Sequence, residues 1–421
     1  MKRILSQLKQ GKSFLLFIGF KTLAEAISFI IPLVVAKVLI PEMFGAFSLF
    51  KMILFLGIAV FIGPLMTPLN IESNKELSKT KKSNKTFTSS LVYSFFSVSF
   101  FLLIYLFFGK ELISFTGLDY NEFKYVFLLA FFGLAIKSFL SNFFISQDNK
   151  NLHVFVELFY NSLLIFSIFI LYKLEVLTMY NIFLSFFISG VLTLVVSLFF
   201  IDYKKILPLS FSSENFKTIA HFSLWVTLGY TSSYLINWGD NIVLRYFVSL
   251  EEIGIYNFAY QVFKGFIMVS FMISTYFTPF ISQNINDKKK MNLYYFNKRV
   301  KILFLSFFFF FLINFFLNLF IRFFYSDYLN SIILIQILSI GAFCSFYHCF
   351  LIPFYNSAGL YKISQLLLLS QVIINILLDI LLIPFLGILG AAIATAISYL
   401  LFTSFYTFYF YKKIKPIYLD L

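Results

Sequence analysis

Long apolar segments alternate with short polar ones along almost the whole chain. A hydrocarbon core about 30 Å thick is crossed by about 20 apolar residues of α-helix. Twelve segments reach that length, and several of them, such as 88–109 and 302–321, contain no charged residue. The pattern predicts an all-α integral membrane protein with twelve transmembrane helices, at about 13–39, 44–70, 88–109, 123–145, 153–172, 180–201, 219–247, 253–281, 302–321, 331–357, 365–384 and 389–411.

The basic residues between these segments predict the orientation of the chain. With both termini placed inside, the inner segments hold 23 lysines and arginines and the outer ones hold four. Such a bias is typical of the cytoplasmic side of a membrane protein. We therefore expect a multi-pass protein of the bacterial cytoplasmic (inner) membrane with both termini in the cytoplasm.

Composition excludes a soluble enzyme. The 421 residues are 60% hydrophobic and 12% charged, whereas soluble domains are about 25% charged. The 64 Phe and 26 Tyr would have no place in a soluble core of this size, but lipid accepts them. The net charge of +14 follows the inner loops, so it indicates membrane lipids as partners and no nucleic acid.

An internal repeat divides the chain into halves. Pro41-Glu42-Met43-Phe44-Gly45 precedes the second span, and Leu250-Glu251-Glu252-Ile253-Gly254 lies 209 residues later before the eighth. Each half has six spans, so the halves run parallel and a pseudo-two-fold axis along the membrane normal relates them. We predict two six-helix bundles, 1–201 and 219–421, joined by a cytoplasmic linker at 202–218.

Ten ionisable residues lie inside the predicted spans. Each costs about 2.5–3.5 kcal/mol or more at a helix centre, so a position facing the interior or water is expected. The basic ones are candidates for binding an anionic substrate: Lys21, Lys37, Lys51, Lys137, Arg245 and Lys264. The acidic ones are candidates for ion coupling: Glu25, Glu157, Asp240 and Asp379.

The repeat pairs four of the basic residues. Lys264 maps within one helical turn of Lys51, and Arg245 maps next to Lys37. We predict that these two quasi-symmetric pairs line one cavity. Lys37 and Arg245 also lie close enough to the outer ends to reach the membrane interface.

Other readings of the intramembrane charges stay open at this point. Lys21 and Glu25 are spaced i,i+4 and are equally consistent with an intrahelical ion pair. Glu157 and Asp379 are equally consistent with interhelical partners. His348 lies between Cys344 and Cys349 without a further ligand nearby, so we expect no metal site and no cofactor.

Three segments resemble signatures of the polysaccharide transporter family, which includes the O-antigen flippases. The segment 36–45 resembles the signature after the first helix, with Lys37 in place of arginine and Ile40 in place of glycine. The segments 240–245 and 252–260 resemble the midpoint signature. The third set, 375–379 with 383–384 and 387–395, resembles the turn between the eleventh and twelfth helices.

The resemblance implies a member of the multidrug, oligosaccharidyl-lipid and polysaccharide exporter superfamily, with alternating access to a cavity between two bundles. In the polysaccharide branch the substrate is an undecaprenyl-pyrophosphate-linked oligosaccharide moved from the inner to the outer leaflet. Such a function serves O-antigen, capsule or exopolysaccharide synthesis, with a polysaccharide polymerase and chain-length machinery as partners. Lysine and arginine suit a pyrophosphate because they offset its desolvation.

Three alternatives remain at the level of sequence. A drug exporter of the same superfamily moves cations, so acidic residues should dominate its cavity. A peptidoglycan-precursor flippase usually has fourteen spans. An integral membrane polysaccharide polymerase commonly has a long outer loop, whereas the longest here runs from Lys110 to Glu122. We therefore expect a transporter and not an enzyme.

Overall fold

The computed structural model of the chain describes residues 2–419, with the side chains of all of these except 2–18, 305, 309, 313 and 361. This part of the chain is almost entirely helical and contains no strand. The helices of the first half are α1 (Lys2–Val38), α2 (Pro41–Gly57), the π-helix η1 (Ile58–Ile62), α3 (Gly63–Thr80), α4 (Asn84–Phe115), α5 (Tyr120–Ser146), α6 (Lys150–Lys173), α7 (Met179–Leu198) and α8 (Tyr203–Ile206).

The second half begins within α9 (Ser213–Phe247), a helix of 35 residues. It continues through α10 (Leu250–Asn284), α11 (Lys288–Asn292), the π-helix η2 (Leu293–Lys298), α12 (Arg299–Phe324), η3 (Ser326–Tyr328), α13 (Ser331–His348), α14 (Ile352–Ser357), α15 (Tyr361–Leu386), α16 (Ile388–Tyr409), the π-helix η4 (Phe410–Ile414) and α17 (Lys415–Tyr418).

The predicted spans correspond to helices of the structure. Within the described residues, eleven helices are long and apolar enough to cross a membrane. The remaining predicted span, 219–247, is α9. Its lower hydropathy comes from polar residues such as Asp240 and Asn241, which are buried and hydrogen-bonded inside the protein. The protein is therefore a multi-pass membrane protein, as the sequence predicted.

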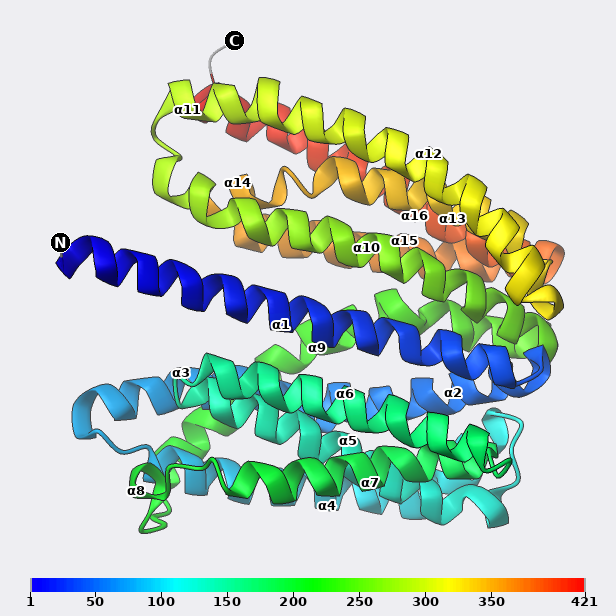
Figure 1. Cartoon of the computed structure of the whole chain (residues 1–421), viewed down its shortest axis with the longest axis horizontal. Helices are drawn as coiled ribbons and strands as arrows, with labels where there is room; N and C mark the ends of the chain where they lie inside the picture. Colours follow the sequence, from blue (N-terminus) through cyan, green and yellow to red (C-terminus); the bar gives the residue numbers. More distant parts are fainter. Residues whose placement is uncertain (1, 420–421) are drawn as a thin grey trace. The chain divides into compact units, whose positions relative to one another are not determined.

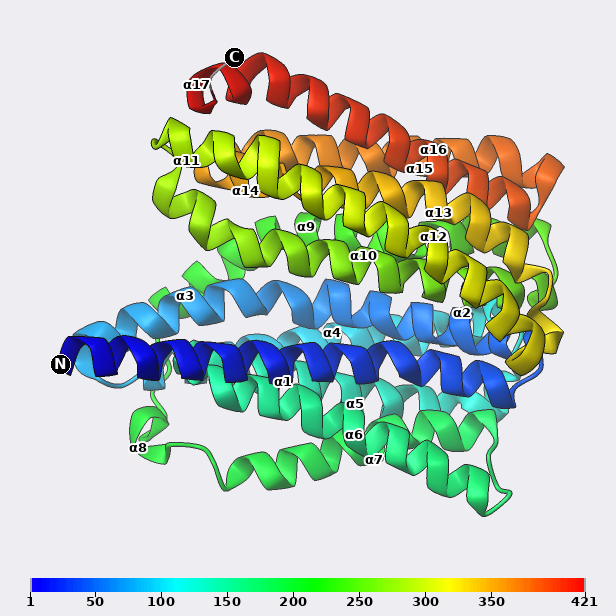
Figure 2. The ribbon, with the colours of Figure 1, turned by 45° about the horizontal axis from the view of Figure 1, so that its top comes forward.

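The chain forms two compact units. The first comprises Met1–Val35 and Ala46–Tyr234, and the second comprises Ala36–Gly45 and Leu235–Leu421. In the first unit α5 packs against α3, α4, α6 and α7 (Figure 1). In the second unit α16 packs against α13 and α15, and α10 packs against α13 and α14 (Figure 2). The first unit ends and the second resumes within α9, between Tyr234 and Leu235. The division into two six-helix bundles joined by a linker at 202–218 remains a prediction.

Local signals in the sequence set where several helices begin. Asp119 accepts a hydrogen bond from the backbone N–H of Glu122 and so caps α5. At the start of α10, Ser249 and Glu252 form a reciprocal capping box, in which each side chain accepts from the other residue's backbone N–H. These caps satisfy backbone donors that have no partner within the helix.

Two helix irregularities coincide with prolines of the predicted spans. Pro64 lies at the start of α3, immediately after the π-helical turn η1. Pro353 lies at the start of α14, after the break that follows His348. A proline removes one backbone donor and clashes with the preceding turn, so a change of helix geometry just before it is the expected result.

The repeated motifs of the two halves contact each other within the second unit. A Cβ atom built on Gly45 would lie 1.9 Å from the carbonyl oxygen of Leu250, and one built on Gly254 would lie 1.9 Å from that of Pro41. Both glycines and both carbonyl residues are separated by the same 209 positions. The starts of α2 and α10 therefore cross around a local two-fold axis, and only glycine fits at the crossing.

Candidate functional site

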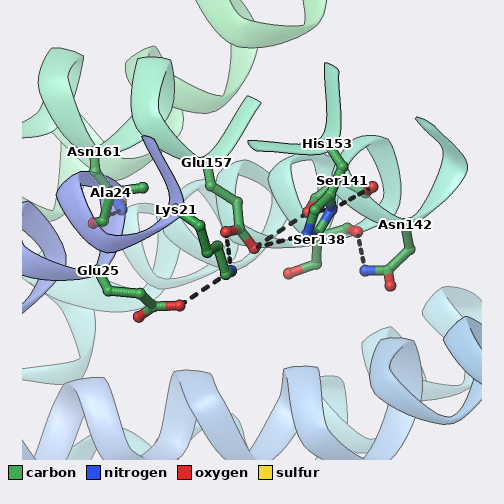
Figure 3. Close-up of polar contacts among 9 residues, drawn as sticks. All are labelled: Lys21, Ala24, Glu25, Ser138, Ser141, Asn142, His153, Glu157 and Asn161. Atoms are coloured by element: carbon green, nitrogen blue, oxygen red, sulfur yellow. Dashed lines mark hydrogen bonds and ion pairs between the residues drawn. The ribbon is translucent and has the colours of Figure 1, made fainter. Parts of the chain in front are cut away.

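A charged network joins α1, α5 and α6 in the first unit (Figure 3). Lys21 pairs with Glu25 one turn along α1, with 3.0 Å between Nζ and Oε1. Lys21 also forms an ion pair with Glu157 of α6. Lys21 and Glu25 thus form the intrahelical pair that their spacing allows, and Glu157 is an interhelical partner.

The network continues from Glu157 to α5. The Ser141 hydroxyl donates to Glu157 at 3.3 Å and lies 2.9 Å from Nδ1 of His153. One turn beyond Glu157, the Asn161 amide donates to the carbonyl oxygen of Ala24 at 3.0 Å. Figure 3 shows Lys21, Ser141 and His153 next to Glu157, and Asn161 next to Ala24. Polar contacts therefore hold α1 to α6 where lysine and glutamate compensate each other's charge.

A second polar cluster lies in the second unit and contains both buried aspartates. Asn375 of α15 donates to Asp240 of α9 and to Asp379 of its own helix, at 2.9 Å in each case. Thr395 of α16 donates to Asp240 at 3.0 Å. The Tyr256 hydroxyl of α10 donates to the same carboxylate. Four helices thus converge on one pair of carboxyl groups, which also contact each other.

This dicarboxylate cluster is not charge-compensated by basic side chains. Asp240 is 4% exposed and Asp379 is fully buried. Where side chains are described, neither aspartate forms an ion pair with lysine or arginine, and one oxygen of Asp379, Oδ1, has no hydrogen-bond partner. Two buried carboxylates without a counter-charge are unfavourable, so a proton or a cation must balance them.

The oxygen atoms of the cluster suit a hard monovalent cation or a proton. They are the carboxylate oxygens and the Thr395 hydroxyl, whereas Asn375 contributes N–H donors to the carboxylates. The described residues contain no group of three or more His, Cys, Asp or Glu side chains arranged to hold a metal ion. The role of Asp240 and Asp379 in ion coupling stays a prediction.

Neutral hydrogen bonds support this cluster from both sides. Ser398 donates to the Asn375 amide oxygen at 3.1 Å, which fixes the amide so that its N–H groups face the carboxylates. Asn257 of α10 donates to Asn241 of α9, next to Asp240. Tyr260 donates to the Ile236 carbonyl oxygen at 3.0 Å. The backbone of α9 is thereby held against α10 around Asp240.

The deeper pair of predicted basic residues lies beside aromatic rings. Lys51 of α2 has its ammonium 5.5 Å from the Phe55 ring. Lys264 of α10 has its ammonium 4.2 Å from the Trp238 ring and 4.9 Å from the Tyr260 ring. An ammonium held over rings keeps its charge available to an anion while remaining partly desolvated. A shared cavity for Lys51 and Lys264 stays a prediction, because the two residues belong to different compact units.

The remaining predicted basic residues have distinct surroundings. The Lys37 ammonium donates to the Phe324 carbonyl oxygen at the end of α12 and lies 5.5 Å from the Tyr325 ring. A lysine at helix-terminal carbonyls is favourable with the helix dipole. Lys137 lies 6.0 Å from the Tyr160 ring, near Glu157. Arg245 is half-buried in α9. Their roles in substrate binding stay predictions.

Sequence reasoning named both aspartates but missed most of their partners. Asn375 and Thr395 belong to stretches that carried the family resemblance, and Asn375 lies one turn before Asp379. Such i,i+4 spacing of polar residues in an apolar helix is a usable signal. Tyr256 also belongs to a stretch that carried the resemblance, 252–260, but as one of 26 tyrosines it gave no separate signal for a carboxylate partner.

A family model described as "Polysaccharide biosynthesis protein" matches residues 11–285, which is more than half of the chain. The chain belongs to this family. An uncharacterized membrane protein of Methanocaldococcus jannaschii is 26% identical over 276 residues, covering 62% of this chain and 53% of that protein. The chain thus matches about half the length of this curated relative.

Solved transporter structures share the fold. The lipid II flippase MurJ, in an inward closed conformation, has a TM-score of 0.74 at 17% identity and covers 94% of this chain and 87% of its own. An inward-facing multidrug resistance MATE family transporter of the MOP superfamily has a TM-score of 0.76 at 14% identity and covers 94% of both chains. The family member described here therefore has the fold of these membrane transporters.

Proposed function

We propose that this family member is a flippase, which moves an undecaprenyl-pyrophosphate-linked oligosaccharide from the inner to the outer leaflet by alternating access. The observation that carries the proposal is membership of the polysaccharide biosynthesis family in a chain with a transporter fold. The product would serve O-antigen, capsule or exopolysaccharide synthesis. We place the protein in the cytoplasmic membrane with both termini inside, working beside a polymerase and chain-length machinery.

The basic intramembrane residues support an anionic substrate. Six lysines and arginines lie inside the predicted spans, against four carboxylates. Lys21 is already paired with Glu25 and Glu157, and Lys37 contacts the end of α12. The repeat places Lys51 and Lys264 on equivalent helices, so we assign these two residues first to the pyrophosphate, with Lys137 and Arg245 after them. A bridging pyrophosphate gains charge-assisted hydrogen bonds where water is scarce.

The dicarboxylate cluster supports ion coupling. Asp240 and Asp379 need a proton or cation to be buried together, and their four helices meet there. Binding of the ion would favour one conformation of α9, α10, α15 and α16 over another. Differential affinity of this kind is what shifts a transporter between its states. Glu25 and Glu157 are weaker candidates because Lys21 compensates both.

Drug export is the second candidate function. The structural similarity to a multidrug transporter favours this function. The TM-score to that transporter is 0.76, and the TM-score to the lipid II flippase is 0.74. The excess of basic over acidic intramembrane residues argues against cationic drugs. Measurements with both substrate classes separate the two candidates.

Complementation tests the proposed function. A strain lacking its surface-polysaccharide flippase receives this gene together with the matching sugar-assembly genes, and surface polysaccharide is measured after membrane levels are matched. We expect restoration by the wild type and loss in Lys51→Ala/Lys264→Ala. Restoration by the double variant would remove these lysines from the proposal. Absence of restoration by well-expressed wild type would contradict the flippase function.

A further inference from the structure

Arg299, the first residue of α12, is buried at the predicted inner end of the second unit. It is 5% exposed, and its Nε is buried without a hydrogen-bond partner. Where side chains are described, Arg299 forms no ion pair with a carboxylate. Asp287 is the acidic residue nearest to it in sequence, and Asp287 pairs with Lys290 at 3.3 Å. A buried arginine charge is therefore left without a counter-charge, which is unfavourable unless an anion binds.

Two aromatic rings pack against this guanidinium. Its Cζ lies 4.2 Å from the centre of the Tyr295 ring and 4.9 Å from that of Tyr347. The Tyr295 hydroxyl donates to the Tyr411 hydroxyl at 2.9 Å, which holds that ring in place. An arginine oriented between rings is pre-organised to donate paired hydrogen bonds to a phosphate or carboxylate.

Two π-helical segments meet beside Arg299. The segment η2 ends at Lys298, immediately before it, and η4 follows α16. Tyr295 of η2 stacks on Phe410 of η4 with ring centres 5.4 Å apart. Isolated π-helical turns inside α-helices occur frequently at functional sites. Here they bring the ends of two helices, far apart in sequence, to the same arginine.

The surroundings combine positive charge with a lipid-facing surface. Leu293, Phe296 and Val300 are each more than half exposed on the helix that carries Arg299. The Lys415 ammonium lies 5.8 Å from the Phe296 ring, so the C-terminal helix α17 adds a cation to the same place. Further basic residues of these segments are Lys298, Lys301, Lys412 and Lys413. A lipid with an anionic headgroup fits such a surface, because its acyl chains contact the apolar side chains, whereas a soluble anion contacts only the positive charges.

We propose that Arg299, between Tyr295 and Tyr347, binds the phosphate of an anionic phospholipid from the inner leaflet. The phosphate supplies the counter-charge that Arg299 lacks, and the acyl chains lie along the exposed apolar residues of η2 and α12. The site joins η2, α12, α13 and η4, so the lipid stabilises the packing of these four segments. It is distinct from the dicarboxylate cluster, and it stands whatever the transported substrate is.

Lipid-dependent stability tests this proposal. The full-length protein is purified in a neutral maltoside detergent, and thermal unfolding is followed with added phosphatidylglycerol, phosphatidylcholine or inorganic pyrophosphate. Native mass spectrometry counts bound lipids. Arg299→Met removes the charge and keeps an apolar stem between the rings. Lys85→Met is the matched control, because it removes one exposed charge from another predicted inner loop.

We expect phosphatidylglycerol, but not phosphatidylcholine, to raise the Tm of the wild type and of Lys85→Met. Arg299→Met should bind phosphatidylglycerol about tenfold more weakly or worse, as expected for a lost charge-assisted hydrogen bond, with an unchanged or higher Tm without lipid. Equal responses of Arg299→Met and wild type would overturn the proposal, as would a lipid-independent loss of Tm in Arg299→Met.

Two further outcomes are decisive. Arg299→Lys keeps the positive charge but loses the planar guanidinium that donates paired hydrogen bonds, so partial lipid binding by this variant supports the site. This variant also replaces Arg299→Met in the test if Arg299→Met accumulates poorly. A wild type that responds to pyrophosphate and not to phosphatidylglycerol would reject the lipid and assign the arginine to a soluble or substrate-borne phosphate.

Discussion

At the scale of single residues, the two aspartates and Lys21 show opposite solutions to burying charge. Lys21 is one-third exposed and forms ion pairs with two glutamates. Asp240 and Asp379 have neutral hydrogen-bond partners, and neither forms an ion pair with a lysine or arginine among the described side chains. The first arrangement is suited to holding helices together. The second is suited to exchanging an ion, because its charge balance depends on something outside the protein.

Asp379→Asn should abolish ion-dependent stabilisation. The wild type should gain thermal stability with increasing sodium, or with acidification if the ion is a proton, because binding to the folded state alone stabilises it. The variant should lose that dependence and transport, while its basal Tm is unchanged or higher because a buried charge is gone. Glu251→Gln, an exposed outer residue, is the control. Retention of the full ion response in Asp379→Asn would contradict the assignment.

Lys21→Met should destabilise the first unit. It leaves Glu157 partly buried without its ion-pair partner, and the expected loss is about 1–3 kcal/mol because the pair is only partly shielded from solvent. Urea unfolding in detergent measures the change. Lys21→Met/Glu157→Leu should recover much of it, since neither charge is then unpaired. A double variant as unstable as the single one would show that the pair does not couple.

The prediction of these residues from sequence was partial for a physical reason. Intramembrane ionisable residues stand out against an apolar background, so all four carboxylates were named. Which of them meet depends on contacts between helices that are far apart in the chain, as with Asp240 and Thr395, 155 residues apart. The i,i+4 pair of Lys21 and Glu25 was readable because its geometry is set within one helix.

At the scale of elements, hydropathy predicted eleven helices that are apolar enough to span a membrane, because lipid demands continuous apolar helices, and the twelfth predicted span is the more polar helix α9. The irregular turns were not predictable in the same way. Pro64 and Pro353 signalled two of them, and Pro416 follows η4 by two residues as Pro64 follows η1, but η2 has no proline within it or just after it. Those π-helical turns are stabilised by mutual contacts such as Tyr295 with Tyr411, which a local pattern does not contain.

Gly45→Ala tests the crossing of α2 and α10. The added methyl group would overlap the Leu250 carbonyl oxygen, so the helices must separate, at a cost of about 1–3 kcal/mol or more. Gly229→Ala in α9 is the matched control, because a Cβ there would have no neighbour within 4 Å. We expect the control to be neutral or slightly stabilising. Equal stability of the two variants in thermal unfolding would contradict a close crossing.

At the scale of the whole molecule, the charge bias predicts the topology. A cysteine at Lys79 should react with a membrane-impermeant maleimide only in inside-out vesicles, and a cysteine at Glu111 only in intact cells. Both positions are exposed, and the native Cys344 and Cys349 are buried, so background labelling should be low. Reversed accessibility would invert the orientation and, with it, the direction in which the substrate is moved.

The glycine crossing also bears on how such a chain arose. A contact in which Pro41 and Gly45 meet Leu250 and Gly254 in the same way from both sides is what two identical polypeptides form when they associate face to face. A single ancestral six-helix chain could have paired with its own copy through this glycine before duplication and fusion. Fusion of two such copies would supply the partner from the same chain and leave the two halves free to diverge in charge while this point of contact stays symmetric.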